Sequence, residues 1–507
     1  MGRVEPVRRV HGPVTALGLL RLAIAGVFVA RLAPTWADSD LWGHLRFGND
    51  IVAAGLVPLR DPYAFTSAER WINQSWLGDI LLSVAWAHGG AAGLVAIKLA
   101  LASAVFCVTL WTLRRAQVPG PLLELLLFLA LAAAYPSIPT VRPHLFSLLC
   151  FAGLLHLQVR RTPPRAAQLL VLPLLMALWA NLHGAWLLGL AELGLWLAVE
   201  ILLGGGDWRR RAGLAAVGVA TVVATLATPY GIGLWAQLWR TMGPSLRDVT
   251  EWRGLWETGS PAIAVWLALV GLGVYAGRGG IRPSHAVVLA FLAFSAWRVR
   301  RTLPFFGLAT VSLLAPQFAA LSRRDAIPRL TGQGTLGPWL RTSLLAAAVA
   351  LIVTSGWQTV RAFACIHVDH TAEADVVAAS FLRRNDAHGR MLTYSDWGLY
   401  AIWHLTPALA VSMDGRREFA YPLAELARHG AIYENAPEAI ADVEALAPDW
   451  VWLPAWLPVI PRLRAHGWQT AFATNRSVVL TREPNAAWTT PPARPLPGCF
   501  PADPEGE

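Results

Sequence analysis

Two aspartates, Asp38 and Asp40, stand directly after the first long apolar stretch of the chain. Carboxylates at this spacing can both reach one point just above a membrane, where they could hold a divalent cation such as Mg²⁺ or Mn²⁺. One of them could instead act as a general base, and His44 in the same segment is a third catalytic candidate. Aspartates are also common as caps at helix starts, so the spacing alone leaves a catalytic and a structural interpretation open.

Arginines gather at positions expected on the same side of the membrane as the aspartates. Arg142 precedes an apolar stretch, and Arg298, Arg300 and Arg301 end another. A triple-arginine cluster on the outer side runs against the usual excess of basic residues in the cytoplasm. Because guanidinium groups bind phosphate oxygens in bidentate fashion, we predict a donor-phosphate ligand, with snorkelling to lipid headgroups as the alternative. Lys98, inside an apolar stretch, is a further phosphate candidate because membrane-buried charges usually face the bundle interior.

Other polar residues are predicted to bind substrate. Asn181 and His183 occupy a very short outer turn, where helix capping is the alternative interpretation. Asp396 and Asp414 each end a short β-run, the position where α/β sheets bind ligands, although Asp-Gly is also common turn chemistry. The substrate-binding candidates are His144, Asn181, His183, Glu251, Arg253, Asp414 and Arg416.

The composition places much of this chain in a membrane. Of its 507 residues, 55% are hydrophobic and 15% are charged, whereas an ordinary soluble domain has roughly 25% charged residues. The apolar excess must therefore face lipid. We predict an all-α polytopic transmembrane bundle of about eleven helices over residues 1–357. The predicted spans cover residues 14–34, 91–113, 120–135, 143–159, 166–181, 184–203, 212–228, 260–277, 284–297, 303–320 and 340–357.

Arginine clusters predict the direction of the helices. Arg3, Arg8 and Arg9 precede the first span, and basic residues before a first helix favour a cytoplasmic N-terminus. With eleven spans, the later clusters, beginning with Arg114-Arg115, also fall on the cytoplasmic side. An odd number of spans places the C-terminal part outside.

The predicted soluble parts have different characters. Residues 35–90 form a long first external loop, in which residues 76–88 are expected to be an interfacial helix because Asp79 and the short length disfavour a span. In residues 358–483, short β-runs alternate with helical patterns, which indicates a small α/β domain. Residues 484–507 are rich in proline and are expected to form a disordered tail.

Cysteines and net charge add little to the functional prediction. Cys365 and Cys499 both lie in the soluble part, where a disulfide between them is one option. The net charge of +10 could suggest nucleic acid. We do not predict such a partner, because the arginines sit in short clusters between apolar runs and do not follow one face.

Together these features resemble the GT-C superfamily of membrane glycosyltransferases, which transfer sugars from polyprenyl-phosphate-linked donors at the outer membrane face. The resemblance rests on the long first external loop that opens with Asp38-Ser-Asp40, on interfacial helices in that loop, and on the C-terminal outer domain. Shorter motifs look like those of a bacterial group of such proteins. They are Trp42-Gly-His44-Leu, Arg142-Pro-His144, Asn181-Leu-His183-Gly, Thr228-Pro-Tyr230-Gly, Arg298-Val-Arg300-Arg301 and Asp414-Gly-Arg416.

The resemblance implies an inverting glycosyltransferase in which Asp38 is the general base and Asp40 assists it or holds a metal. It also implies three kinds of partner: membrane lipid, a polyprenyl-phosphate sugar donor, and a saccharide, lipid or protein acceptor. The implied location is the bacterial inner (plasma) membrane. No second acidic motif can be assigned in this sequence, so the requirement for a metal stays open.

Two other functions fit parts of the pattern. A lipid-linked saccharide transporter or a polysaccharide-assembly protein without catalysis would also need outer arginines and intramembrane charges. Transporters usually consist of two related halves with broken helices, and no such repeat is seen in the sequence. A third possible function is a sensor whose outer α/β domain binds a ligand, but the sequence shows no cytoplasmic output domain.

Overall fold

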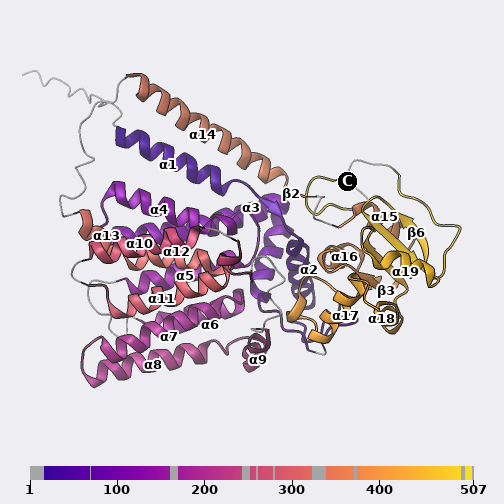
Figure 1. Ribbon diagram of the computed structural model, residues 1–507. Helices are drawn as coiled ribbons and strands as arrows, with labels where there is room; N and C mark the ends of the chain where they lie inside the picture. The colour runs from indigo at the N-terminus through magenta and orange to yellow at the C-terminus, as the bar shows by residue number, and fades with distance from the viewer. Residues whose placement is uncertain are drawn as a thin grey trace, which may run out of the picture.

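The structure is a computed structural model that describes residues 16–68, 70–159, 169–241, 252–258, 261–277, 280–322, 338–369, 374–492 and 497–504. The substrate-binding candidate Glu251 lies outside these residues. A bundle of helices occupies the first part of the chain, and a smaller domain built on a β-sheet packs against one end of it (Figure 1).

The bundle helices follow the predicted apolar stretches. Leucine, alanine and valine dominate them, and Pro stands within the first turn of α4, α11 and α12, where its missing N–H costs no helical bond. The helices are α1 (Ala16–Leu32), α3 (Trp76–Arg115), α4 (Gly120–Ala134), α5 (His144–Gln158), α6 (Val171–Leu182), α7 (Trp186–Leu203), α8 (Trp208–Ala224), α10 (Ala262–Ala276), α11 (Pro283–Arg298), α12 (Leu303–Leu313), α13 (Ala315–Ser322) and α14 (Pro338–Ala364).

Within the described residues, three helical segments are both long and apolar enough to cross a membrane: Trp76–Arg115, Trp186–Leu203 and Thr342–Ala364. Four shorter segments are also apolar: Leu122–Ser137, His144–Gln158, Val171–Leu182 and Ala262–Ala276. The mainly helical prediction is therefore confirmed, whereas the number of eleven spans stays a prediction.

Helix α3 joins two elements that the sequence analysis separates. The predicted interfacial helix 76–88 and the predicted span 91–113 meet at Gly90, whose φ of 51° and ψ of −137° break the helical path. This left-handed φ is readily available only to glycine. The part of α3 before Gly90, which we call the predicted interfacial arm, therefore runs in a different direction from the part after it, and α3 packs beside α2 (Ser39–Ala54).

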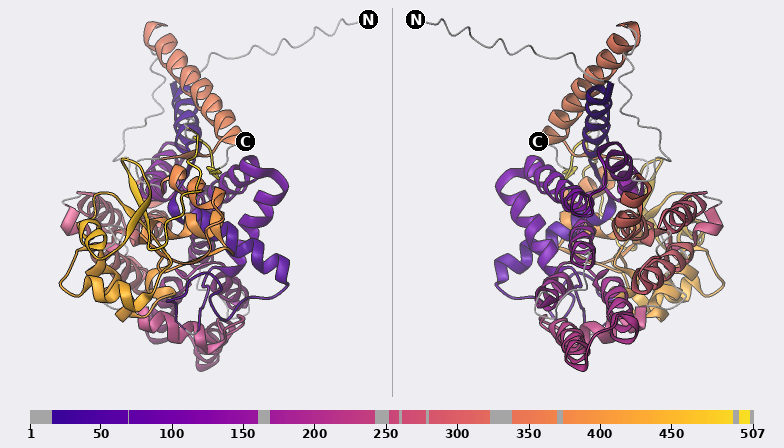
Figure 2. Two further views of the ribbon diagram at one scale, coloured as in Figure 1. Left: turned by 90° about the vertical axis from the view of Figure 1, so that its right-hand side faces the viewer. Right: turned by 90° about the vertical axis from the view of Figure 1, so that its left-hand side faces the viewer.

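Helices α1 and α14 pack along each other and stand out from the rest of the bundle (Figure 2). The segments that follow them, β1 (Trp36–Ala37) and β2 (His367–Val368), pair in parallel. Both helices therefore leave the bundle at the end that carries the sheet domain (Figure 1). This arrangement brings residues 35–90, the predicted first external loop that contains the aspartates, next to the start of the sheet domain, which we call the outer domain after its predicted location.

The outer domain contains a five-stranded sheet in the order β4-β3-β5-β7-β6. Strands β4 (Leu409–Val411), β3 (Gly389–Thr393) and β5 (Trp450–Pro454) are parallel, while β7 (Ser477–Thr481) and β6 (Gln469–Ala473) complete the sheet in antiparallel pairs. Its helices are α15 (Val376–Arg384), α16 (Gly398–Leu405), α17 (Leu423–Tyr433), α18 (Ala439–Leu446) and α19 (Val459–Ala465). The sheet and helices agree with the α/β character expected from the sequence.

The end of the C-terminal tail, residues 497–504, packs against the rest of the protein, which differs from the disorder expected from the prolines. Phe500 is 4% exposed and contacts the Trp42 ring at a centroid distance of 5.0 Å. The Trp42 indole N–H donates to the carbonyl of Pro501 at 2.8 Å. A disulfide joins Cys365 to Cys499 and holds the tail beside the end of α14. Composition alone could not show these contacts, because they come from residues distant in sequence.

Candidate functional site

The first site element is the turn into α2. Asp38 is the N-cap of this helix, and its Oδ1 accepts a hydrogen bond from the backbone N–H of Asp40 at 3.1 Å. Its other oxygen, Oδ2, accepts from the Nε–H of Arg142, which lies just before α5. Nη2 of Arg142 is 3.3 Å from Oδ2 of Asp40. One guanidinium therefore bridges both carboxylates, and Asp38 is a helix cap and a charged site residue at once.

The two carboxylates have different electrostatic surroundings. Burial raises the pKa of Asp38, and the negative charge of Asp40 adds to this rise, although Arg142 opposes it. Burial also acts to raise the pKa of Asp40, but the positive charges of Arg142, His44 and Arg301 outweigh it and lower the pKa. Two neighbouring acids whose pKa values are pushed apart are typical of a division between proton transfer and charge stabilisation. Asp38 is the better proton acceptor of the pair.

A chain of hydrogen bonds fixes His44. Its Nδ1 is 2.8 Å from Oδ1 of Asp79, a fully buried carboxylate on the predicted interfacial arm of α3. The other Asp79 oxygen accepts from the side-chain amide of Asn73 at 2.7 Å, and the Asn73 carbonyl oxygen accepts from the N–H of Ser75 at 3.0 Å. Asp79 therefore accepts at both oxygens, so Nδ1 of His44 carries a proton. Although burial opposes it, the charge of Asp79 raises the pKa of His44.

The arginine cluster divides at the end of α11. The helix ends at Arg298, and Arg300–Thr302 form a 3₁₀ turn. Arg298 and Arg300 are exposed, whereas Arg301 is half-buried, stacks over the Trp252 ring at 5.8 Å and helps to lower the pKa of Asp40. The change from α to 3₁₀ geometry places Arg301, alone of the three, near the aspartates.

Comparison with solved structures identifies the architecture that holds this site. The chain superposes on the archaeal oligosaccharyltransferase AglB from Archaeoglobus fulgidus, in complex with an inhibitory peptide and a dolichol-phosphate, with a TM-score of 0.56. The sequence identity is 12%, over 86% of this chain and 69% of that chain. For ArnT from Cupriavidus metallidurans in the apo state, the TM-score is 0.52 and the identity 13%, over 92% and 98% of the two chains.

The chain has the GT-C fold. The fold expected from the resemblance is therefore confirmed. The three long apolar helical segments of the described residues agree with the predicted multi-pass membrane location. No family model matches the sequence, and the search of curated proteins gives no match.

Within this GT-C fold, two histidines lie beside the bridging arginine. His144 is the first residue of α5, and its ring centroid is 6.5 Å from that of His183. Trp179 donates to Oγ of Ser147 at 2.7 Å, and that oxygen lies 2.8 Å from Nδ1 of His183. Because the backbone N–H of Ala185 also donates to Nδ1, this nitrogen is an acceptor and Nε2 carries the proton. His183 can therefore present a neutral N–H donor.

Asn181 has protein partners for its whole side-chain amide. Its oxygen accepts from the indole of Trp76 at 2.9 Å, and its nitrogen donates to the carbonyls of Ala177 at 2.8 Å and Ala227 at 2.9 Å. These bonds tie α3, α6 and the segment after α8 together. These contacts hold helices together and are not a helix cap, and a substrate contact of Asn181 stays a prediction.

Lys98 lies apart from the arginines. Its ammonium donates to the carbonyls of Leu32 at 2.9 Å and Pro34 at 2.7 Å, and to the hydroxyl of Thr35 at 2.6 Å. These acceptors match the three donors of an ammonium group. Lys98 thus fixes the chain segment that leads from α1 to Asp38, which is a different position from the phosphate contact expected of it.

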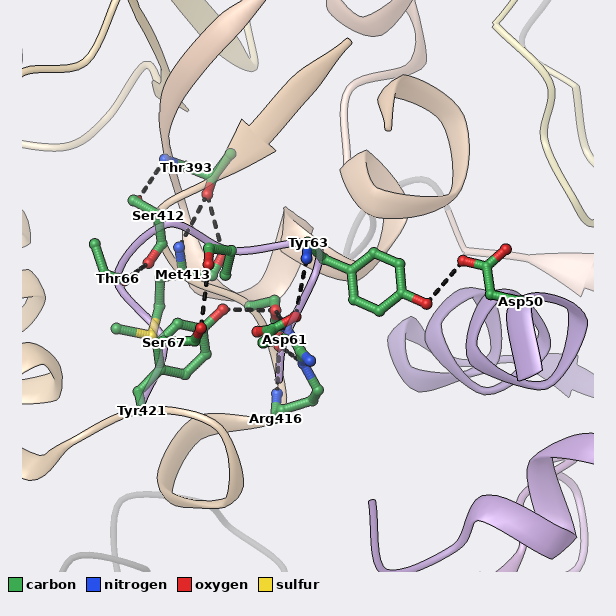
Figure 3. A network of polar contacts seen from close by, with 12 residues as sticks. Asp50, Asp61, Tyr63, Thr66, Ser67, Thr393, Ser412, Met413, Arg416 and Tyr421 are labelled. Carbon is green, nitrogen blue, oxygen red and sulfur yellow. Dashed lines mark hydrogen bonds and ion pairs between the residues drawn. The ribbon is translucent and has the colours of Figure 1, made fainter. Parts of the chain in front are cut away.

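Asp414 and Arg416 form a buried network with Asp61. Figure 3 shows Arg416 beside Asp61 and Tyr421. Nη2 of Arg416 lies 2.6 Å from Asp414 and 2.7 Å from Asp61, while the hydroxyl of Tyr421 donates to Asp414 at 2.6 Å. The ring of Trp71 lies 4.8 Å from the guanidinium carbon of Arg416. Asp61 could not be predicted as part of this network from local sequence patterns, because its partner Arg416 is 355 residues away.

The network holds the Asp414–Arg416 loop over the acid pair. A Cβ at Gly415 would lie 3.3 Å from Oδ1 of Asp40. The backbone of the outer domain therefore reaches the site, while the Arg416 guanidinium stays locked between carboxylates. Arg253 approaches from the bundle side, where its carbonyl accepts from the backbone N–H of Arg300 at 3.0 Å.

The residues present give weak support to a divalent metal site. Arg142 lies against both Asp38 and Asp40, the oxygens that a cation would need. Within the described ranges, no group of three His, Cys, Asp or Glu residues is arranged to hold a metal. A structure of the A. fulgidus oligosaccharyltransferase in complex with Zn and sulfate has a TM-score of 0.50 to this chain, at 12% identity over 92% of this chain and 73% of that chain.

Proposed function

We propose that this protein is a membrane glycosyltransferase that moves a sugar from a polyprenyl-phosphate-linked donor to an acceptor at the outer membrane face. The observation that carries the proposal is the Asp38–Arg142–Asp40 cluster, in which one arginine bridges two acids of divergent pKa. The GT-C fold and the dolichol-phosphate in the AglB complex support the assignment.

The cluster supplies the two functions that glycosyl transfer requires. The acceptor hydroxyl must lose a proton as it attacks the sugar, and the departing phosphate must have its negative charge stabilised. Asp38 would accept the proton on a carboxylate oxygen. Arg142 and Arg301 would bind the phosphate oxygens and stabilise their negative charge. The Nε2–H of His183 would donate a hydrogen bond to one of these oxygens and keep its proton. Attack from the face opposite the phosphate would invert the sugar carbon.

Asp40 and His44 would influence the reaction through their charges, which act on Asp38 and Arg142. The negative charge of Asp40 makes Asp38 a stronger base, since it raises the pKa of Asp38. His44, whose Nδ1 bonds to Asp79, would add positive charge near Asp40. A divalent cation, if one binds, would add charge stabilisation at the phosphate, and the steps above are assigned to the protein's own residues.

The test measures product formation with purified full-length protein in proteoliposomes. A panel of radiolabelled undecaprenyl-phosphate monosaccharides serves as donors, with a lipid and saccharide extract of the host envelope as acceptors. We expect release of undecaprenyl phosphate together with label in a new acceptor product. Movement of intact labelled donor across the bilayer without product would support the transporter and contradict the transferase.

The proposal also requires the site to face the outer side of the inner membrane. We propose a cytoplasmic N-terminus, eleven spans and an external domain after residue 358. A phosphatase reporter that works only outside the cytoplasm should be active when fused after Arg384 and inactive after Arg114. Activity of the Arg114 fusion, with silence of the Arg384 fusion, would contradict this topology.

A further inference from the structure

The outer domain carries an aromatic and acidic surface beside the acid pair that the mechanism above does not use. It consists of Tyr394, Asp396, Tyr433 and Trp456, which we call the strand-end surface. Tyr394 and Asp396 follow β3, and Trp456 follows β5. The carboxyl ends of parallel strands form one edge of a sheet, and this edge is where α/β domains usually bind ligands.

The strand-end surface adjoins the catalytic aspartates. The third parallel strand, β4, leads into Gly415, which lies against Asp40. Gly398, two residues after Asp396, packs so closely on Asp414 that a Cβ there would come within 2.5 Å of the Asp414 Cα. Although the Asp396 side chain reaches solvent, desolvation by the surrounding protein raises its pKa, and the charge of Asp40 adds to this rise while Arg417 opposes it.

The aromatic rings are held rigidly. The hydroxyl of Tyr433 donates to the carbonyl of Thr393 at 2.6 Å, which fixes its ring 5.3 Å from that of Tyr394. Trp397, 5% exposed, supports Tyr394 at 5.7 Å. The Trp456 ring stands 6.1 Å from Tyr394 and is 70% exposed. A large exposed ring placed on a fixed support costs little conformational entropy when a ligand stacks on it.

Asp396 provides the polar part of the surface. It is exposed, and within the described residues its hydrogen-bond partner is the hydroxyl of Ser395 at 3.3 Å. An ionised carboxylate has about four lone-pair sites, so most of its acceptor capacity is available to a ligand. A carboxylate next to aromatic faces matches a saccharide, whose ring has apolar C–H faces and an edge of donating hydroxyls.

The backbone around the surface argues against a peptide strand as the ligand. Peptides that bind by strand addition need an exposed sheet edge. The free edge of β4 is covered by the first external loop, because Phe65 donates to the carbonyl of Val411 and Val411 donates to the carbonyl of Tyr63, each at 3.1 Å. The other edge strand, β6, lies at the opposite side of the sheet from β4.

We propose that the strand-end surface is a subsite for a saccharide acceptor, which stacks on Trp456 and donates hydroxyl hydrogens to Asp396. The inference rests on the proposed transferase function for its biological meaning, since the bound saccharide would extend toward Asp38. It names the acceptor class, which the reaction chemistry alone leaves open.

The test is binding of the fluorescently labelled full-length protein in detergent to a printed array of defined mono- and oligosaccharides, with a diverse peptide array beside it. Wild type and Asp38→Asn should bind the same subset of glycans. Trp456→Ala and Asp396→Asn should each weaken this binding roughly tenfold. Trp339→Ala removes another exposed tryptophan, 86% exposed on α14, and should leave the binding unchanged.

Three outcomes would overturn the subsite: no glycan bound by wild type, peptides bound in place of glycans, or glycan binding unaffected by Trp456→Ala. Because Asp38→Asn is expected to bind without transferring, the array result is independent of catalysis. Failure of the transferase assay with glycan binding intact would count against the enzyme and leave the saccharide subsite supported.

Discussion

Two clusters of aspartate and arginine lie close together in this molecule and differ in their degree of closure. In the outer domain, Arg416 is 8% exposed at its side chain and its partners Asp61 and Asp414 are fully buried. At the start of α2, the Arg142 side chain is 17% exposed, and those of Asp38 and Asp40 are 15% and 34% exposed.

The difference distinguishes the structural role of Arg416 from the functional role that we propose for Arg142. The guanidinium of Arg416 forms ion pairs with two carboxylates and lies against an aromatic ring, so its positive charge is neutralised within the protein. Arg142 bridges acids whose pKa values are pushed in opposite directions, and solvent reaches all three side chains. Buried, fully paired charges stabilise a specific packing, whereas partly open clusters with shifted pKa values favour chemistry. Residue type and spacing could not distinguish Asp38-Ser-Asp40 from Asp414-Gly-Arg416.

The largest expected difference between the two clusters comes from replacing the arginine of each by alanine. Arg416→Ala leaves two buried carboxylates without their counter-charge and should lower the free energy of unfolding by about 3–5 kcal/mol. Arg142→Ala leaves acids that solvent still reaches and should lower the free energy of unfolding by less than Arg416→Ala does, while lowering the transfer rate on the order of 10²-fold. Thermal unfolding and turnover of both variants check this. Equal loss of stability in the two would contradict the division of roles.

The arginine cluster after α11 offers a smaller effect. Arg301→Lys keeps the charge but loses the bidentate fork, so turnover should fall roughly tenfold. Arg298→Lys and Arg300→Lys change exposed side chains and should leave turnover near wild type. The measurement is donor turnover normalised to expression. If all three variants turned over donor at the wild-type rate, the arginine cluster would not bind the donor phosphate, and snorkelling to lipid headgroups would remain as its role.

The smallest expected effect is a shift in pH dependence. The negative charge of Asp40 raises the pKa of Asp38, so Asp40→Asn should lower that pKa. The rate rises with pH as Asp38 loses its proton, and in the variant this rise should therefore occur at lower pH. A pH–rate profile of wild type and variant measures the direction. A shift to higher pH would show that Asp40 does not act through Asp38.

The sequence predicted features that depend on local pattern. Apolar periodicity predicted the helices and the change to an α/β domain, and the order of loop and domains predicted the GT-C fold. It could not predict contacts between distant segments, such as those of Asp79 with His44, Asp61 with Arg416, and the tail with Trp42. It also missed the 3₁₀ turn at Arg300, because backbone geometry at a helix end depends on the packing around it.

Transfer by Asp38→Asn compared with wild type is the most direct test of the proposed base. Asparagine caps a helix as well as aspartate does, so α2 should stay folded and expression and thermal unfolding should match wild type. An amide cannot accept the acceptor's proton, and we expect turnover to fall on the order of 10² to 10⁴-fold. Turnover at the wild-type rate in a folded Asp38→Asn protein would contradict the assignment of Asp38 as the general base.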